Sequence, residues 1–178
     1  MTKFSANLGF LWSDRSLIDA IYAAHAAGFE TVECHWPYEY DAAEVKAALD
    51  ATGLTMLGLN TVRGKLVDNE NGLAALPGRE DEARAGIDQA LRYAAAINTQ
   101  NIHVMAGFAE GGAAENCFIE NLRYATNQQQ HVTFLIEPLN HYDAPGYFLS
   151  STDQARRIIE AVAAPNLKLM FDCYHIQI

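Results

Sequence analysis

Two acidic residues in the C-terminal half of the chain stand directly after runs of apolar side chains. Glu137 follows the run Thr133-Phe-Leu-Ile136, and Asp172 follows Leu169-Met-Phe171. A carboxylate at such a position is costly to bury unless it is paired with a cation or binds a metal ion. The spacing alone leaves two interpretations open. Each carboxylate could cap the helix that follows or pair with an arginine, or the two could share one divalent cation.

The metal interpretation has a geometric basis, because the two apolar runs are consecutive strands in the chain. Neighbouring strands of a parallel sheet lie about 5 Å apart, so carboxylates at their ends would be close to each other. Two such groups either raise the pKa of one of them strongly or share a divalent cation. Carboxylate oxygens suit Mg²⁺ or Mn²⁺. If the two share a cation, Glu137 and Asp172 are its ligands and Mg²⁺ or Mn²⁺ is the expected cofactor, but the spacing alone does not decide between a metal site and helix caps or ion pairs.

Three further polar residues are weaker candidates for contacts with a substrate. Arg63 lies in the loop after the third apolar run and could bind a substrate carboxylate through two hydrogen bonds, or it could be a solvated loop charge. His103 alternates with apolar neighbours, a pattern that fits a satisfied interior histidine as well as a substrate contact. Glu33, at the end of the second strand, could hydrogen-bond to substrate or to a neighbouring loop.

The elements that would position these residues follow one repeated order of a short apolar strand, a loop and an amphipathic helix. Ser16 and Asp41 have the spacing of helix N-caps, and Gly28 and Gly53 stand where helices commonly end. Apolar side chains at helical spacing predict further helices around residues 83–94, 115–126 and 158–162. The six predicted strands span residues 4–9, 31–34, 54–59, 101–105, 132–136 and 167–171.

This alternation of strands and helices predicts an α/β protein with a parallel sheet covered by helices. An open doubly wound sheet and a closed (β/α)8 TIM barrel both fit the order. Aromatic residues, rather than a glycine-rich phosphate loop, follow the first strand, and this favours the TIM barrel. A TIM barrel has eight strands and about 250 residues. We therefore expect residues 1–178 to form a single, partial TIM-barrel domain that is not by itself a complete active enzyme.

Composition and charge narrow the class of protein. Half of the residues are hydrophobic, and the net charge is −10 with an isoelectric point of about 4.9. An acidic chain repels nucleic acids and anionic membranes, so we expect neither as a partner. The sequence has no signal-peptide run at its start and no stretch of roughly 18 apolar residues. The three cysteines are widely spaced and odd in number, which indicates reduced thiols and a cytoplasmic location.

Four segments carry a pattern that is more specific than any single residue. They are Asn60-Thr-Val-Arg-Gly64, Ile136-Glu-Pro-Leu-Asn140, Asp143-Ala-Pro-Gly-Tyr-Phe-Leu149 and Phe171-Asp-Cys-Tyr-His175. Together they resemble the hydroxypyruvate isomerase family of xylose-isomerase-like TIM barrels, and the resemblance runs in order along the whole chain. Members interconvert hydroxypyruvate and tartronate semialdehyde, or longer 2-oxo acids such as 2-oxotetronate. The resemblance implies an aldose–ketose-type isomerase of carbohydrate metabolism that acts on a small anionic 2-oxo acid.

The resemblance also implies roles for individual residues. Glu137 matches the glutamate that binds metal and moves the proton through an enediolate, and Asp172 matches the metal-ligand aspartate. His175 matches a histidine of the substrate site in related barrels. The family's remaining ligands and its second catalytic glutamate are expected beyond residue 178. An epimerase of the same superfamily and a non-catalytic barrel relative are alternative functions, and a homo-oligomer is compatible with the sequence.

Overall fold

The computed structural model describes residues 3–178, apart from the side chain of Leu66, and the chain divides into two compact units. Unit 1 comprises residues 1–60 and 90–101, and unit 2 comprises residues 61–89 and 102–178. In the described part of the chain, no helix is long and apolar enough to cross a membrane. Cys34, Cys117 and Cys173 are free thiols, as the sequence predicts.

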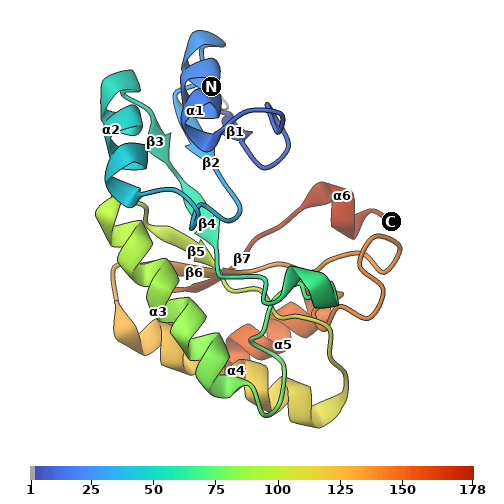
Figure 1. Ribbon diagram of the computed structural model, residues 1–178. Helices are drawn as coiled ribbons and strands as arrows, with labels where there is room; N and C mark the ends of the chain where they lie inside the picture. Colours follow the sequence, from blue (N-terminus) through green and yellow to red (C-terminus); the bar gives the residue numbers. More distant parts are fainter. Residues whose placement is uncertain (1–2) are drawn as a thin grey trace. The chain divides into compact units, whose positions relative to one another are not determined.

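Unit 1 contains a three-stranded parallel sheet in the order β1-β2-β3. The strands are β1 (Ser5–Asn7), β2 (Thr31–Glu33) and β3 (Thr55–Met56), and β4 (Gly58–Asn60) follows them. Helices α1 (Leu17–Ala26) and α2 (Ala42–Thr52) connect the strands and pack against each other. The remaining segment of unit 1 holds the last turns of the long helix α3 (Glu80–Ala96) (Figure 1).

The predicted caps explain where the helices of unit 1 begin and end. The Ser16 hydroxyl oxygen accepts a hydrogen bond from the Asp19 backbone N–H at 3.1 Å, and an Asp41 carboxylate oxygen accepts one from Ala43 N–H at 2.7 Å. These side chains satisfy donors that the first helical turn leaves without a partner. Gly53 ends α2 in the left-handed conformation, with φ of 70°. The cap predictions for α1 and α2 are confirmed.

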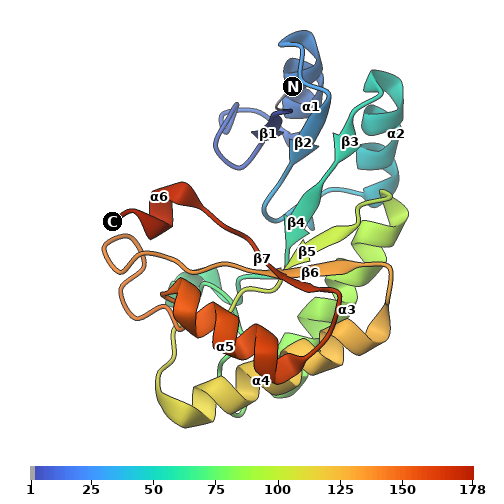
Figure 2. The same cartoon turned by 180° about the vertical axis from the view of Figure 1, so that it is seen from behind.

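Unit 2 is organised around the parallel strands β5 (Asn101–His103), β6 (Thr133–Ile136) and β7 (Leu167–Leu169), of which Asn101 alone is assigned to unit 1. In the register of β6 and β7, Ile136 lies opposite Leu169. Helices α4 (Gly111–Gln128) and α5 (Thr152–Val162) lie side by side against these strands, as both views show (Figures 1 and 2). The core between helices and strands contains the fully buried side chains of Phe118, Leu122, Phe134, Ile136, Ile158 and Leu167.

The structure corrects several predicted boundaries. The predicted strand 54–59 is divided into β3 and β4 at Leu57, the predicted strand 101–105 ends at His103, and α4 is longer at both ends than the predicted 115–126. The predicted strand 167–171 ends at Leu169. A short helix, α6 (Cys173–Ile176), begins after Asp172 because an Asp172 carboxylate oxygen accepts the Tyr174 backbone N–H at 2.7 Å.

Backbone hydrogen bonds join the loops that follow the strands within unit 2. Gly72 pairs with Ala106 in an antiparallel bridge, and Phe108 pairs with Tyr147 in another. The Gly72 N–H also donates to the Arg63 carbonyl at 2.8 Å. These contacts connect three segments, residues 61–79, 104–110 and 137–151. We call these three segments the loop rim, and it carries Arg63 and Glu137.

A second contact holds the start of the loop rim. The Glu70 carboxylate accepts the Lys65 backbone N–H at 2.6 Å and forms an ion pair with Arg79. Gly64, with φ of 95°, lies so close to Glu70 that an added Cβ would overlap its carboxylate. This part of the segment 61–79, which includes the 3-10 helix η1 (Leu66–Asp68), is therefore folded around the Glu70 side chain.

Candidate active site

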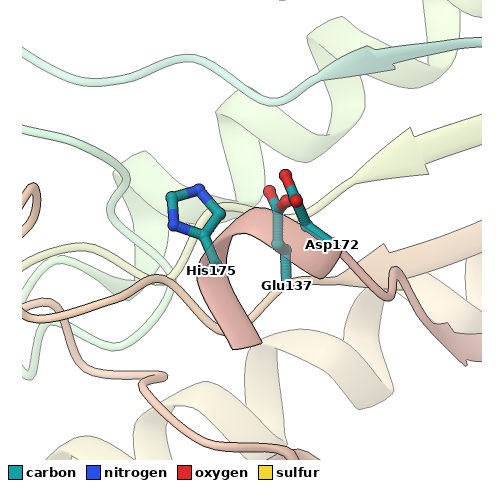
Figure 3. A group of neighbouring side chains, drawn as sticks. All are labelled: Glu137, Asp172 and His175. Atoms are coloured by element: carbon teal, nitrogen blue, oxygen red, sulfur yellow. The ribbon is translucent and has the colours of Figure 1, made fainter. Parts of the chain in front are cut away.

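Three side chains of unit 2 meet where β6 and β7 end. Glu137 directly follows β6, Asp172 precedes α6, and His175 lies within α6. One ligand atom from each residue lies within 4.8 Å of the others, and all three residues are half-buried. Figure 3 shows the two carboxylates next to each other with the imidazole beside them. Parallel pairing of β6 and β7 produces this arrangement, because it brings the chain segments after both strands to one edge of the sheet.

Glu137 has two further neighbours from the loop rim and β5. The His103 Nδ1 atom lies 3.8 Å from a Glu137 carboxylate oxygen, and the His103 side chain is only 4% exposed. Tyr147 is also buried, and its hydroxyl oxygen accepts the Ala106 backbone N–H at 2.9 Å. Burial raises the pKa of Tyr147, and the nearby negative charge of Glu137 raises it further. Tyr147 is therefore a neutral neighbour of Glu137 at physiological pH.

His175 is oriented by Asn140, which is buried. The Asn140 backbone N–H donates to His175 Nδ1 at 3.2 Å, and the Asn140 side-chain Nδ2 lies 2.9 Å from the same atom. Both Asn140 groups are donors, so Nδ1 must accept, and the ring proton of the neutral imidazole lies on Nε2. An Nε2–H group is a hydrogen-bond donor and has no lone pair for a metal ion. This arrangement suits an oxygen of a substrate better than a metal ion at Nε2.

The carboxylate oxygens of Glu137 and Asp172 are suitable ligands for a divalent cation. Two carboxylates within 4.8 Å supply hard oxygen ligands of the kind that Mg²⁺ and Mn²⁺ bind. Two negative charges this close in a half-buried site also repel each other unless a proton or a cation separates them. Glu137 and Asp172 thus form a candidate metal site, and His175 lies within reach of a molecule bound there.

The other predicted site residues lie in different places. His103 is beside Glu137, as described above. Arg63 is half-buried in the loop rim of unit 2, where its carbonyl accepts the Gly72 N–H. Glu33 ends β2 and belongs to unit 1. Its charge adds to burial in raising the pKa of the neighbouring Cys34 thiol to about 12.

Sequence reasoning did not single out Tyr147 or Asn140 as site residues. Both occur in the quoted family segments, but neither has a spacing that indicates chemistry. A buried asparagine and a buried tyrosine hydroxyl need hydrogen-bond partners. Those partners, at Ala106 and His175, are far away in sequence. Only the folded arrangement of the loops shows them.

The strand order, the helix layer and the strand-end carboxylates define the chain as a barrel of the xylose isomerase-like type. The family model of xylose isomerase-like TIM barrels matches residues 21–178. The strands in the described residues 3–178 form part of such a barrel, so the predicted fold class is confirmed and the open doubly wound sheet is excluded.

Comparisons with individual proteins specify the family. The chain is 46% identical to 2-oxo-tetronate isomerase of Cupriavidus necator, in an alignment covering 100% of this chain and 71% of that protein. It is 38% identical to hydroxypyruvate isomerase of Escherichia coli, in an alignment covering 99% of this chain and 71% of that protein. The chain superimposes with a TM-score of 0.96 on a crystal structure from Brucella melitensis that is described as an AP endonuclease of family 2. The two sequences are 37% identical, and the superposition covers 100% of this chain and 71% of the other. The chain belongs to the family of hydroxypyruvate isomerases and 2-oxo-tetronate isomerases.

Proposed function

We propose that this protein is a metal-assisted isomerase that interconverts hydroxypyruvate and tartronate semialdehyde, or a related 2-oxo acid such as 2-oxotetronate. The observation that carries the proposal is the group of Glu137, Asp172 and His175, whose ligand atoms lie within 4.8 Å in a chain of this isomerase family. Glu137 and Asp172 would hold the metal, with Mg²⁺ or Mn²⁺ preferred for a carboxylate site. When bound, the cation supplies Lewis-acid stabilisation of negative charge on substrate oxygens.

Glu137 is the group that moves the proton. In hydroxypyruvate, its carboxylate removes a proton from the hydroxymethyl carbon, leaving an enediolate. Return of a proton to the neighbouring carbon, together with transfer of the terminal hydroxyl proton to the oxygen of that carbon, then gives tartronate semialdehyde. The proton leaves one carbon and enters the next, so a second carboxylate is useful, and by the family pattern it lies beyond residue 178. The buried His103 and Tyr147 lie beside Glu137 and cover part of this carboxylate.

Two residues are proposed to bind the substrate. The Nε2–H of His175 donates a hydrogen bond to a substrate oxygen, which becomes stronger as negative charge develops in the enediolate. Arg63 binds the substrate carboxylate, because a guanidinium matches a carboxylate with two parallel hydrogen bonds. His103 and Glu33 are retained as weaker candidates for substrate contacts. The expected partner is therefore a small anionic 2-oxo acid.

The test is an isomerase assay on the intact protein with hydroxypyruvate and 2-oxotetronate, with and without added Mn²⁺. We expect Glu137→Gln to lower kcat by about 10²–10⁴-fold, the usual loss when a proton-transferring group is removed. The matched control is Glu160→Gln, because Glu160 is exposed and forms only a surface ion pair with Arg156. Asp172→Asn should weaken Mn²⁺ binding in calorimetry.

Each alternative function gives a different result. An epimerase of the same superfamily would leave both 2-oxo acids unchanged and epimerise a ketose instead. A non-catalytic relative would turn over neither class of substrate. A nuclease would have to bind DNA against a net charge of −10, which counterion release does not favour. Full activity of Glu137→Gln on hydroxypyruvate would refute the role given to Glu137.

A further inference from the structure

Asp143 is an exposed carboxylate in the loop after β6 that contacts two parts of unit 2. Its Oδ2 atom accepts a hydrogen bond from Asn140 Nδ2 at 2.8 Å and another from the Tyr174 hydroxyl at 2.7 Å. Asn140 belongs to the same loop, whereas Tyr174 lies in α6, the helix that carries His175. Asp143 therefore connects the loop after β6 with the helix after β7.

The first of these contacts fixes the orientation of the Asn140 amide. The Asn140 Oδ1 atom accepts the backbone N–H groups of Tyr142 and Asp143 at 3.0 and 2.9 Å. The Nδ2 group on the other side donates to Asp143 Oδ2 and lies 2.9 Å from His175 Nδ1. Rotating the amide by half a turn would place Oδ1 against the Asp143 carboxylate and would confront two backbone N–H groups with an NH₂ group. The Asp143 carboxylate thus acts together with these two backbone N–H groups to hold one amide orientation.

That orientation reinforces the tautomer that the Asn140 backbone N–H already favours, because this group also donates to His175 Nδ1 at 3.2 Å. With Nδ2 directed at Nδ1, the imidazole must accept at Nδ1 and keep its proton on Nε2. With the amide reversed, Oδ1 would face Nδ1 and oppose the backbone N–H donor there, so the preference for a proton on Nε2 would weaken. A hydrogen bond to one ring nitrogen commonly sets the role of the other in this way.

The second contact fixes the position of α6. This helix has four residues and buries no side chain completely, so few apolar contacts hold it. The Asp172 cap fixes its first turn, and the Tyr174 hydroxyl bond to Asp143 attaches its exposed side to the loop. The hydrogen bonds from Asn140 and Tyr174 also hold the pKa of Asp143 below its usual range, so the carboxylate stays charged at neutral pH.

We propose that Asp143 is a positioning residue of this site, which acts through Asn140 and Tyr174 to hold His175 with its Nε2–H directed at the substrate. The kinetic part of this inference rests on the proposed isomerase function. Asp143 itself touches neither substrate nor metal in this scheme. Its removal should therefore affect turnover through His175 and leave the two carboxylate ligands in place.

The experiment compares variants at Asp143, Tyr174 and His175 in the intact protein. Asp143→Ala should lower kcat/KM for the 2-oxo acid about 10–100-fold, the usual effect of removing a second-layer partner. Asp143→Asn should retain most of the activity, because its remaining oxygen accepts both hydrogen bonds. Tyr174→Phe should give a smaller loss than Asp143→Ala. In a His175→Ala background, Asp143→Ala should cause no further loss, and Mn²⁺ affinity should change less than about threefold.

Matched controls separate this mechanism from a general loss of folding. Asp153→Ala removes an exposed carboxylate from the first turn of α5, and Tyr142→Phe removes a hydroxyl from an exposed ring, so both should leave kcat/KM unchanged. An equal loss in Asp153→Ala, or a full additive loss of Asp143→Ala on top of His175→Ala, would overturn the proposal.

A measurement without turnover distinguishes failure of this inference from failure of the proposed function. The ¹⁵N spectrum of histidine-labelled protein reports which ring nitrogen of His175 carries the proton, and His175→Ala assigns the signal. We expect the Nε2–H form in the wild type and in Asp143→Asn, and a smaller share of it in Asp143→Ala, where the Asn140 backbone N–H remains on Nδ1. If no isomerase activity is found but this pattern holds, the positioning role stands and the proposed function falls. A wild-type Nδ1–H form would refute the positioning role whatever the activity.

Discussion

Gly72 is a residue of the loop rim at which one added methyl group would meet the backbone of a neighbouring segment. Its φ of 114° is in the region that side chains rarely adopt, and an added Cβ would lie 2.5 Å from the Met105 carbonyl oxygen. The positive φ costs about 1–2 kcal/mol. Forcing the two backbones apart adds about 1–3 kcal/mol, by analogy with overpacked sites. Gly72→Ala should therefore reduce the free energy of unfolding by about 2–5 kcal/mol.

Gly78→Ala is the matched control for this change. Gly78 also has a positive φ, 85°, but nothing lies within 4 Å of an added Cβ. Its substitution should cost only the conformational part, about 1–2 kcal/mol. Urea unfolding of both variants in the intact protein measures the difference. Because the Gly72 N–H donates to the Arg63 carbonyl, Gly72→Ala should also raise KM for the 2-oxo acid, whereas Gly78→Ala should not. Unfolding free energies within about 0.5 kcal/mol of each other would refute the close approach at Gly72.

Two further predictions concern charged residues of the same loop. Arg63→Ala should raise KM roughly 10- to 150-fold, as expected for loss of a charge-assisted contact of about 1.5–3 kcal/mol. Arg157→Ala, at an exposed position of α5, should leave KM unchanged. An unchanged KM in Arg63→Ala would make Arg63 a loop charge only. Hydrogen bonds from Lys65 N–H and then Arg79 lower the pKa of Glu70. The Glu70 carboxylate therefore stabilises the folded state above about pH 4.3, and this stabilisation is lost as the pH falls through the lowered pKa. Urea midpoints measured from pH 3 to 7 should converge for wild type and Glu70→Gln at low pH, and parallel curves would contradict this.

The parts of the fold that the sequence predicted are those controlled by local chemistry. Ser16, Asp41 and Gly53 define helix ends through contacts within a few residues, and the structure reproduces them. The start of α4 lacks such a signal, because it begins at Gly111-Gly112 and its N-cap residue, Glu110, makes no side-chain cap bond. Packing of the later apolar face, rather than local propensity, extends this helix to its full length. The prediction consequently began the helix too late.

The same distinction applies to the candidate site. Glu137 and Asp172 could be brought together from the sequence because parallel strands place the residues that follow them at one edge, whatever the loops do. Their proposed roles came from the family resemblance. Asn140 could not be found in this way, because its partner His175 is 35 residues away and its contact depends on how the loop after β6 folds.

The hydrogen bonds from Asn140 also distinguish the role of His175 from the roles of the two neighbouring carboxylates. Distance alone groups His175 with Glu137 and Asp172 as three candidate ligands. The two donors from Asn140 occupy Nδ1, so the remaining nitrogen of the neutral ring carries a proton and offers a hydrogen bond rather than a lone pair. A site made of two acceptor carboxylates and one donor imidazole can bind a cation and an anionic oxygen side by side. That combination is what proton transfer through an enediolate requires, because the carboxylate must accept a proton while the substrate oxygen gains negative charge.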